Sequence, residues 1–352
     1  MTSSTGLPLL AAALLAVTVP AMAGPAVAAP SEEESPEERS PAFHISDPRV
    51  VESSGLAASR HHEGVYWTHN DSGEQYAPML YGVDDTGETV ATVTLTGAGV
   101  QMRDWEAVAV APGADGEPAI YVGDIGDNFD GGWPTIRLYR LPEPRTLGDT
   151  TVEATTFTFS YADGGRDAES LLVDPRDGRI YIVSKEAGGG IYAAPEELAT
   201  DATNQLTRLG SAPLYATDAS FAPDGSHYAI RTYWGATIYD ATDGVPGSAV
   251  ERLTLPDSAQ GESLAYTGTG DALLAGSEGA TSPVWRIPVP GESGEDTDDA
   301  ATGASPSPAA TSAGGDAAGG RDLNRVAGTA LLIGVGAVAL AIAGIVWLAR
   351  RS

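Results

Sequence analysis

Cysteine is absent from this sequence. Its absence excludes disulfide bonds, thiolate metal sites and a cysteine nucleophile. An exported domain that has no disulfides must take its stability from its core, from closure of its sheets or from a bound ion.

Positive charge is also scarce. The chain has 19 basic against 48 acidic residues, a formal charge of -29, and Lys185 is its single lysine. This balance argues against binding of nucleic acid or of an anionic lipid surface through charge. We interpret the acidic surface as an adaptation for solubility, or as one that gathers cations.

Several catalytic and metal-binding motifs are missing as well. The sequence has no Gly-x-Ser-x-Gly and no P-loop. The pair His61-His62 lacks a second pair of zinc ligands and favours an exposed turn. Residues 127–131 resemble part of a calcium loop but lack its spacing and closing glutamate, so we interpret them as a turn.

The two ends of the chain differ from its middle. Residues 1–28 contain an apolar run and two Ala-x-Ala sites, which predicts a signal peptide. Residues 29–41 form an acidic disordered spacer, and residues 291–325 a flexible stalk.

The C-terminal residues predict a membrane anchor. Residues 326–349 carry no charge, and at ~1.5 Å per residue a helix of this length crosses ~30 Å of hydrocarbon. Residues 350–352, with Arg350 and Arg351, form a cytoplasmic tail. We therefore expect a single-pass protein of the cell membrane with its N-terminal domain outside the cell.

Residues 42–290 contain a repeated pattern, in which a polar cluster precedes an apolar strand start. It occurs at residues 51–56, 103–110, 166–171, 217–221 and 260–264. A period near 50 residues is typical of propellers and solenoids. Each repeat divides into short strands A to D separated by turn residues, as at residues 174–178. The sequence predicts an all-β fold, a five-bladed β-propeller of four-stranded blades.

The last repeat lacks one strand, and the N-terminus can supply it. Phe43, His44 and Ile45 precede the first repeat, and they complete the last blade if the ring closes. Closure hides sheet edges that otherwise aggregate. An open sandwich and a six-bladed ring with one degenerate blade are the alternatives.

Carboxylates and aromatic residues gather in the D-to-A and B-to-C loops, which share one face of a propeller. We call this face the mouth. The A-to-B loops hold mostly ordinary turn residues. The residues that we expect to meet a ligand at the mouth are Asn70, Asp71, Asp124, Asp127, Lys185, Arg231 and Trp234.

Three glutamates occupy matching positions at the start of the innermost strands: Glu106, Glu169 and Glu262. By the same register the first blade offers Ser54 and the fourth Ala219, with Ser53 and Ser220 adjacent. Converging carboxylates need a counter-charge. That charge is either a hard cation, for which oxygen ligands suit Ca²⁺ or Mg²⁺, or the side chains of Arg103, Arg166 and Arg231.

The blade openings resemble those of calcium-activated nucleotidases. The resemblance lies in residues 52–56, residues 105–108 with 121–123, residues 168–170, and residues 219–221 with Pro223. Those apyrases are five-bladed propellers that hold calcium on the axis with serines and glutamates. The resemblance implies Ser53 or Ser54, Glu106, Glu169, Ser220 and Glu262 as ligands of a Ca²⁺ ion.

Three functions are compatible with these features. The first is a propeller that binds a divalent cation and an extracellular ligand, a small molecule or a glycan, at its acidic mouth. The second is a calcium-dependent hydrolase of phosphate esters or glycosides, for which Asp104 and Asp167 are the catalytic candidates. The third is a scaffold that docks proteins. We put binding first because the mouth has few basic residues to hold a polyphosphate.

Overall fold

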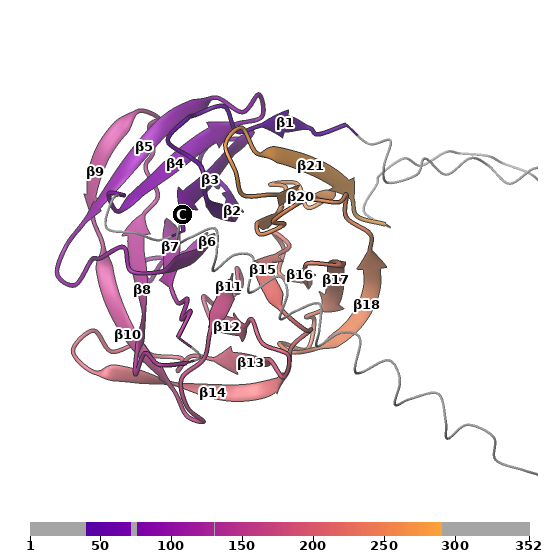
Figure 1. Ribbon diagram of the computed structural model, residues 1–352. Coiled ribbons are helices and arrows are strands. Elements are labelled where there is room, and N and C mark those ends of the chain that lie inside the picture. Colours follow the sequence, from indigo (N-terminus) through magenta and orange to yellow (C-terminus); the bar gives the residue numbers. More distant parts are fainter. Residues whose placement is uncertain (1–39, 72–75, 130, 291–352) are drawn as a thin grey trace, which may run out of the picture. The chain divides into compact units, whose positions relative to one another are not determined.

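The computed structural model describes residues 40–71, 76–129 and 131–290, which belong to one compact unit (Figure 1). Within these ranges the regular structure is entirely β, and no helix there could cross a membrane. The predicted signal peptide, stalk, membrane span and cytoplasmic tail lie outside the described residues, as does the spacer up to residue 39.

The strands form antiparallel runs of four, each starting near the centre of Figure 1 and ending at its rim. The first run is β2 (Ser53–Ala58), β3 (Val65–Asn70), β4 (Met79–Asp84) and β5 (Thr89–Thr96). The second is β6 (Trp105–Pro112), β7 (Pro118–Asp124), β8 (Ile136–Pro142) and β10 (Thr155–Tyr161).

The next runs have the same order. The third is β11 (Ala168–Val173), β12 (Ile180–Ser184), β13 (Gly190–Ala193) and β14 (Thr203–Ser211). The fourth is β15 (Ala216–Phe221), β16 (His227–Thr232), β17 (Gly235–Asp240) and β18 (Ser248–Leu253). The last is β19 (Leu264–Tyr266), β20 (Ala272–Gly276), β21 (Pro283–Pro288) and β1 (Phe43–His44).

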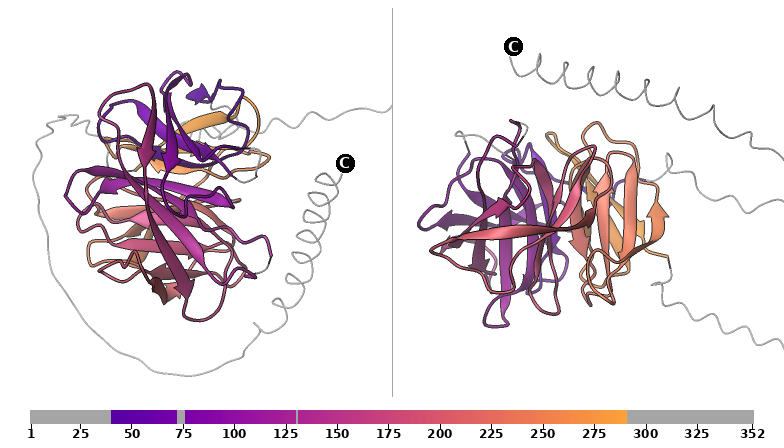
Figure 2. Two further views of the ribbon diagram at one scale, coloured as in Figure 1. Left: turned by 90° about the vertical axis from the view of Figure 1, so that its left-hand side faces the viewer. Right: turned by 90° about the horizontal axis from the view of Figure 1, so that it is seen from below.

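The inner strands close a circle. In the order β2, β6, β11, β15 and β19 each contacts the next, and β19 contacts β2. The sheets stand side by side around this circle (Figures 1 and 2). An all-β chain whose sheets are arranged in this way is a β-propeller.

The N-terminal strand takes the position that the sequence predicts for it. Phe43 pairs with Val284 and His44 with Pro283, so that β1 becomes the outer strand of the last run. The ring of Phe43 lies 6.1 Å from that of Tyr66 in the first run. The strand therefore joins the two ends of the propeller.

Pairing at the outer rim differs from the expected pattern of separate blades. An additional strand, β9 (Asp149–Glu153), pairs in parallel with β5. The outer strands β10 and β14 also pair in parallel, which joins the second and third runs into one sheet of eight strands. These pairs could not be predicted from the sequence because they link strands that belong to different repeats.

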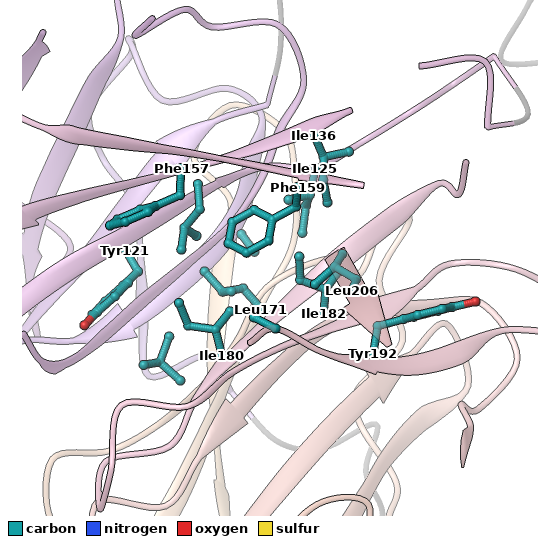
Figure 3. Close-up of a cluster of buried hydrophobic side chains, with 14 of the residues drawn as sticks. Tyr121, Ile125, Ile136, Phe157, Phe159, Leu171, Ile180, Ile182, Tyr192 and Leu206 are labelled. Carbon is teal, nitrogen blue, oxygen red and sulfur yellow. The ribbon is translucent and has the colours of Figure 1, made fainter. Parts of the chain in front are cut away.

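The core consists of separate clusters of apolar side chains, each between two neighbouring runs. The cluster between the second and third runs includes Phe157, Phe159 and Leu171 (Figure 3). Trp67 and Trp105 lie in the cluster between the first and second runs and are inaccessible to solvent. Burial of one such side chain contributes roughly 1.5–3 kcal/mol, so these clusters supply stability that disulfides provide elsewhere.

Candidate metal centre

A β-bulge marks the start of each inner strand from β2 to β15. In β6, Trp105 pairs with Asp124 and Ala107 with Gly123, so Glu106 is the extra residue. In β11 the extra residue is Glu169. A bulge leaves one residue unpaired and re-aims its side chain, and here it turns a glutamate toward the mouth in two neighbouring strands.

The remaining inner strands fill this position with other residues. The extra residue of β15 is Thr217, and the bulge of β2 includes Ser54. Glu262 precedes Leu264 by two residues, as Glu106 precedes Val108, and Leu264 is the first paired residue of β19. We call the residues at this matched position of the five inner strands the tier. They are Ser54, Glu106, Glu169, Thr217 and Glu262.

This arrangement corrects the register that the sequence predicts for β15. The sequence matched Ala219 to the glutamates, but Ala219 pairs with Ile230 as Val108 pairs with Val122, two residues further along the strand. Ser220 is further still from the mouth, where its hydroxyl accepts the N–H of Tyr266 and lines a cavity of about 970 Å³ at the opposite end of the ring. It does not join the carboxylates.

A cluster of three buried carboxylates lies between the first and second runs. Asp71 follows β3, Asp104 precedes β6 and Glu106 is the bulge residue. One carboxylate oxygen from each lies within 4.8 Å of the others. Glu106 is only 5% exposed. We call these residues the acidic triad.

Burial and mutual repulsion shift the triad toward its protonated form. The pKa of Asp104 is raised to about 7, first by burial and then by the charges of Asp71, Asp167 and Asp124, which outweigh the opposing charge of Arg103. Burial likewise raises the pKa of Glu106 well above its usual value, with the charge of Glu169 adding to it. Carboxylates held this way are costly to ionise without a nearby cation.

Glutamates 169 and 262 have a counter-charge of their own. Lys185 forms an ion pair with Glu169, and its side chain is largely buried. Burial alone would lower the pKa of Lys185, but the charges of Glu169 and Glu262 raise it well above its usual value. The lysine therefore stays charged and offsets one of the two carboxylates, while burial raises the pKa of both Glu169 and Glu262.

The arginines that the sequence offered as neutralisers are engaged elsewhere. Arg103 lies 3.8 Å from Asp124 and stacks over Trp133, while Arg166 pairs with Asp163 and Glu186. Within the described ranges none of the three predicted arginines forms a salt bridge with a tier glutamate.

Arg231 is buried and donates to backbone oxygens. Its Nη1 donates to the carbonyls of Ser263 and Gly276, at 2.7 and 2.5 Å. Burial lowers its pKa to about 10, against the opposing charges of Glu262 and Asp218. It lies between the fourth and last runs and does not reach the surface of the mouth.

Other predicted mouth residues organise the loops. The amide of Asn70 accepts from the N–H groups of Val51 and Glu52. Asp124 accepts from the N–H of Asp104 and the hydroxyl of Tyr139. These contacts hold Asn70 and Asp124 below the surface, beside the triad.

The loop after β7 closes through two more aspartates. Asp127 accepts from the N–H groups of Phe129 and Trp133, and Asp167 accepts from the N–H of Asp127. Burial raises the pKa of Asp167, and the N–H of Asp127 opposes the shift. The bond to Phe129 closes a turn at residues 127–129, and residue 130 lies outside the described residues. Trp234, by contrast, is 65% exposed.

Gly126 completes the wall of the triad. A Cβ at this position would lie 2.6 Å from Asp104 Oδ2 and 2.6 Å from Glu106 Oε1. The buried Glu169 Oε2 has no hydrogen-bond partner within the described ranges. A small cradle of carboxylate oxygens with this chemistry fits a hard cation.

The sequence does not indicate the importance of two residues near the mouth, Glu278 and Gly126. Burial raises the pKa of Glu278 to about 7, with Glu262 adding to the shift, and Ser54 and Gln260 donate to its carboxylate. Gly126 lies in the loop after β7, where a glycine is common and carries no signal by itself. Only its contact with two acids, which requires the fold, distinguishes it.

The strand order and the buried carboxylates define the class of protein: a β-propeller with an acidic mouth. No family model matches the sequence, and neither does any curated protein.

Several solved structures show a limited similarity. A gluconolactonase from Xanthomonas campestris is 14% identical, with a TM-score of 0.43 over 69% of this chain and 88% of that chain. A luciferin-regenerating enzyme is 12% identical, with a TM-score of 0.42 over 70% of this chain and 94% of that one. For U3-55K the identity is 10% and the TM-score 0.37, over 70% and 98% of the two chains.

Proposed function

We propose that this protein is a five-bladed propeller that binds a divalent cation, Ca²⁺, with its acidic triad. The observation that carries the proposal is that Asp71, Asp104 and Glu106 bring three buried carboxylate oxygens within 4.8 Å of one another beside a glycine with no side chain. Oxygen ligands without nitrogen or sulfur favour a hard cation.

The blade count is inferred from the runs of strands. Each run of four antiparallel strands is taken as one blade, although parallel pairing of β10 with β14 joins two of them at the rim. The order of contacts between inner strands supports this assignment.

The proposed ligand set differs from the one that the nucleotidase resemblance implies. Glu106 is common to both. Glu169 and Glu262 share Lys185, Ser54 donates to Glu278, and Ser220 lies toward the other end of the ring. We therefore assign the ion to the side of the mouth formed by the first and second blades, off the axis.

We further propose that the mouth faces the extracellular space and that the C-terminal residues anchor the propeller in the cell membrane. The composition of residues 1–28 and 326–349 supports this placement. The cation would then bridge the triad and an extracellular ligand.

The experiment is thermal unfolding of the full chain with excess CaCl₂ and with EGTA. A ligand that binds only the folded state at about 100 times its Kd stabilises by roughly 2.7 kcal/mol, and we expect the Tm to rise by about 5–10 °C. Mg²⁺ in place of Ca²⁺ tests the choice of ion.

Two variants locate the effect. Glu106→Gln should abolish the calcium shift, whereas Glu88→Gln, at an exposed carboxylate of the β4–β5 turn, should retain it. No calcium shift in the unmodified chain, or an equal shift in the Glu106→Gln variant, would refute the assignment.

Turnover assays separate binding from catalysis. Calcium-dependent release of phosphate from nucleotides, or of the aryl group from aryl glycosides, would favour the hydrolase alternative, with Asp104 and Asp167 as the residues to replace first. A calcium shift without turnover favours binding.

A further inference from the structure

A second feature of the mouth is a platform of aromatic rings centred on the exposed Trp234. Thr232 pairs with Gly235, so β16 and β17 are joined by a turn whose two central residues are Tyr233 and Trp234. The Thr232 hydroxyl accepts from the N–H of Trp234 and donates to the Gly235 carbonyl. The tight turn holds the 65% exposed indole in place.

Tyr215 supports this platform at some conformational cost. Its φ of 52° lies in the left-handed region, which costs a residue with a side chain roughly 1–3 kcal/mol. Its N–H donates to the Glu186 carbonyl, and its ring centroid lies 6.1 Å from that of Trp234. The ring of Tyr233 also contacts Trp234, edge to face, with 6.2 Å between the ring centroids.

A groove of about 600 Å³ runs beside Trp234. Its walls come from the end of β14, from the β16–β17 turn and from the end of β18. Leu214, which is 52% exposed, is its other large apolar residue at the surface. The volume is within the ~300–1,000 Å³ typical of ligand sites.

The polar groups of the groove are mostly uncharged hydroxyls. Ser211, Thr237 and Thr254 line it, and their hydroxyls form no hydrogen bond with the described residues. Arg252 is the single charged residue among the described lining residues. The chain as a whole, with a charge of -29, repels anionic polymers. The groove itself has one charged residue, Arg252, among its described lining residues, so its lining suits a neutral ligand.

We propose that this groove binds a neutral oligosaccharide, with Trp234 as the stacking platform. A pyranose ring presents an apolar C–H face, which suits a flat indole, and equatorial hydroxyls, which suit the free hydroxyls of the groove. An apolar peptide would leave those hydroxyls without partners, which is costly once they are buried. This site does not require the proposed cation.

The test is calorimetric titration of the full chain with neutral hexasaccharides of glucose, mannose and xylose, in the presence of EGTA. We expect one of them to bind and to quench tryptophan fluorescence. Trp234→Ala should weaken binding about tenfold or more, because it removes the ring on which the sugar stacks, and Trp234→Phe should retain part of the affinity.

The matched control is Phe129→Ala, which removes another exposed ring from the mouth, 72% exposed, without touching the groove. Its affinity should equal that of the unmodified chain. The proposal fails if no hexasaccharide binds at about 5 mM, if Trp234→Ala binds unchanged, or if an uncharged apolar peptide competes for Trp234 in place of the sugars. Gly126→Ala should leave sugar binding intact, which separates this proposal from the cation site.

Discussion

Asp104 Oδ2 and Glu106 Oε1 both lie 2.6 Å from the point where a Cβ on Gly126 would stand. The two acids come from the same strand start, and the glycine comes from the loop after the neighbouring strand. The backbone at Gly126 therefore forms a wall of the acidic triad, and the space beside it depends on a missing side chain.

Gly126→Ala is expected to displace both carboxylates. The calcium-dependent rise in Tm should disappear, while the unfolding free energy in EGTA should change by no more than about 1–3 kcal/mol, since overpacking has that typical cost. Thermal unfolding with calcium and with EGTA measures both. Gly188→Ala, at another glycine without a left-handed φ but with no atom within 4 Å of its would-be Cβ, controls for the change of residue alone. A full calcium response in the Gly126 variant would contradict the proposed wall.

Stability in the absence of calcium should fall as the pH rises from about 4 to about 7. Burial raises the pKa of Asp104 from 3.8 to about 7, so the unfolded chain releases this proton at a lower pH than the folded chain. At about 1.4 kcal/mol per pKa unit, Asp104 alone costs on the order of 3–4 kcal/mol near pH 7. Urea unfolding at pH 5, 6, 7 and 8 checks the trend. The contribution of Asp104 should level off above about pH 8, and Asp104→Asn should make the curve less steep.

Calcium should reverse that loss. The ion takes the place of the protons on the triad, so its binding should release protons, and the gain in Tm should be larger at pH 8 than at pH 5. Titration calorimetry in two buffers of different ionisation enthalpy measures the released protons. Equal calcium shifts at both pH values would contradict this linkage.

Lys185→Met should destabilise the fold strongly at neutral pH. The change leaves Glu169 and Glu262 without their shared counter-charge, and breaking a buried pair typically costs 3–5 kcal/mol. The cost should shrink at pH 5, where the two glutamates can hold protons. Urea unfolding at pH 5 and 7.5 measures the difference. Arg145→Gln breaks an exposed pair with Glu117 and should cost less than about 1 kcal/mol.

Phe43→Ala tests the strand that closes the ring. Phe43 is buried against Tyr66, and its loss should cost about 3–5 kcal/mol of unfolding free energy. Leu147→Ala, at an exposed apolar residue, should be nearly neutral. If the two variants unfold alike, β1 does not hold the first and last runs together.

Much of the fold could be predicted because strands and the turns between them have recognisable local sequence patterns. The turn at residues 174–178 lies between β11 and β12, as the sequence predicts for a turn between strands A and B. The parallel pairs at the rim could not be foreseen, because they join strands that lie far apart in the sequence.

The site was predicted less well than the fold. The sequence placed Glu106 correctly at a strand start, but the position of Thr217 depends on a bulge, which adds one residue to the count without leaving a sequence mark. The link between Lys185 and Glu169 also requires the fold, since a lysine next to Glu186 suggests a surface pair instead.

The outer pairs β5–β9 and β10–β14 act as straps that bind the first three runs to one another, and the described part of the fourth run has no such strap on β18. Strain applied to the ring should therefore open it at the unstrapped side. Backbone amides of β17 and β18 should therefore exchange with solvent before those of β7 or β12. The region that carries the aromatic groove would then open locally more often than the region that carries the acidic triad.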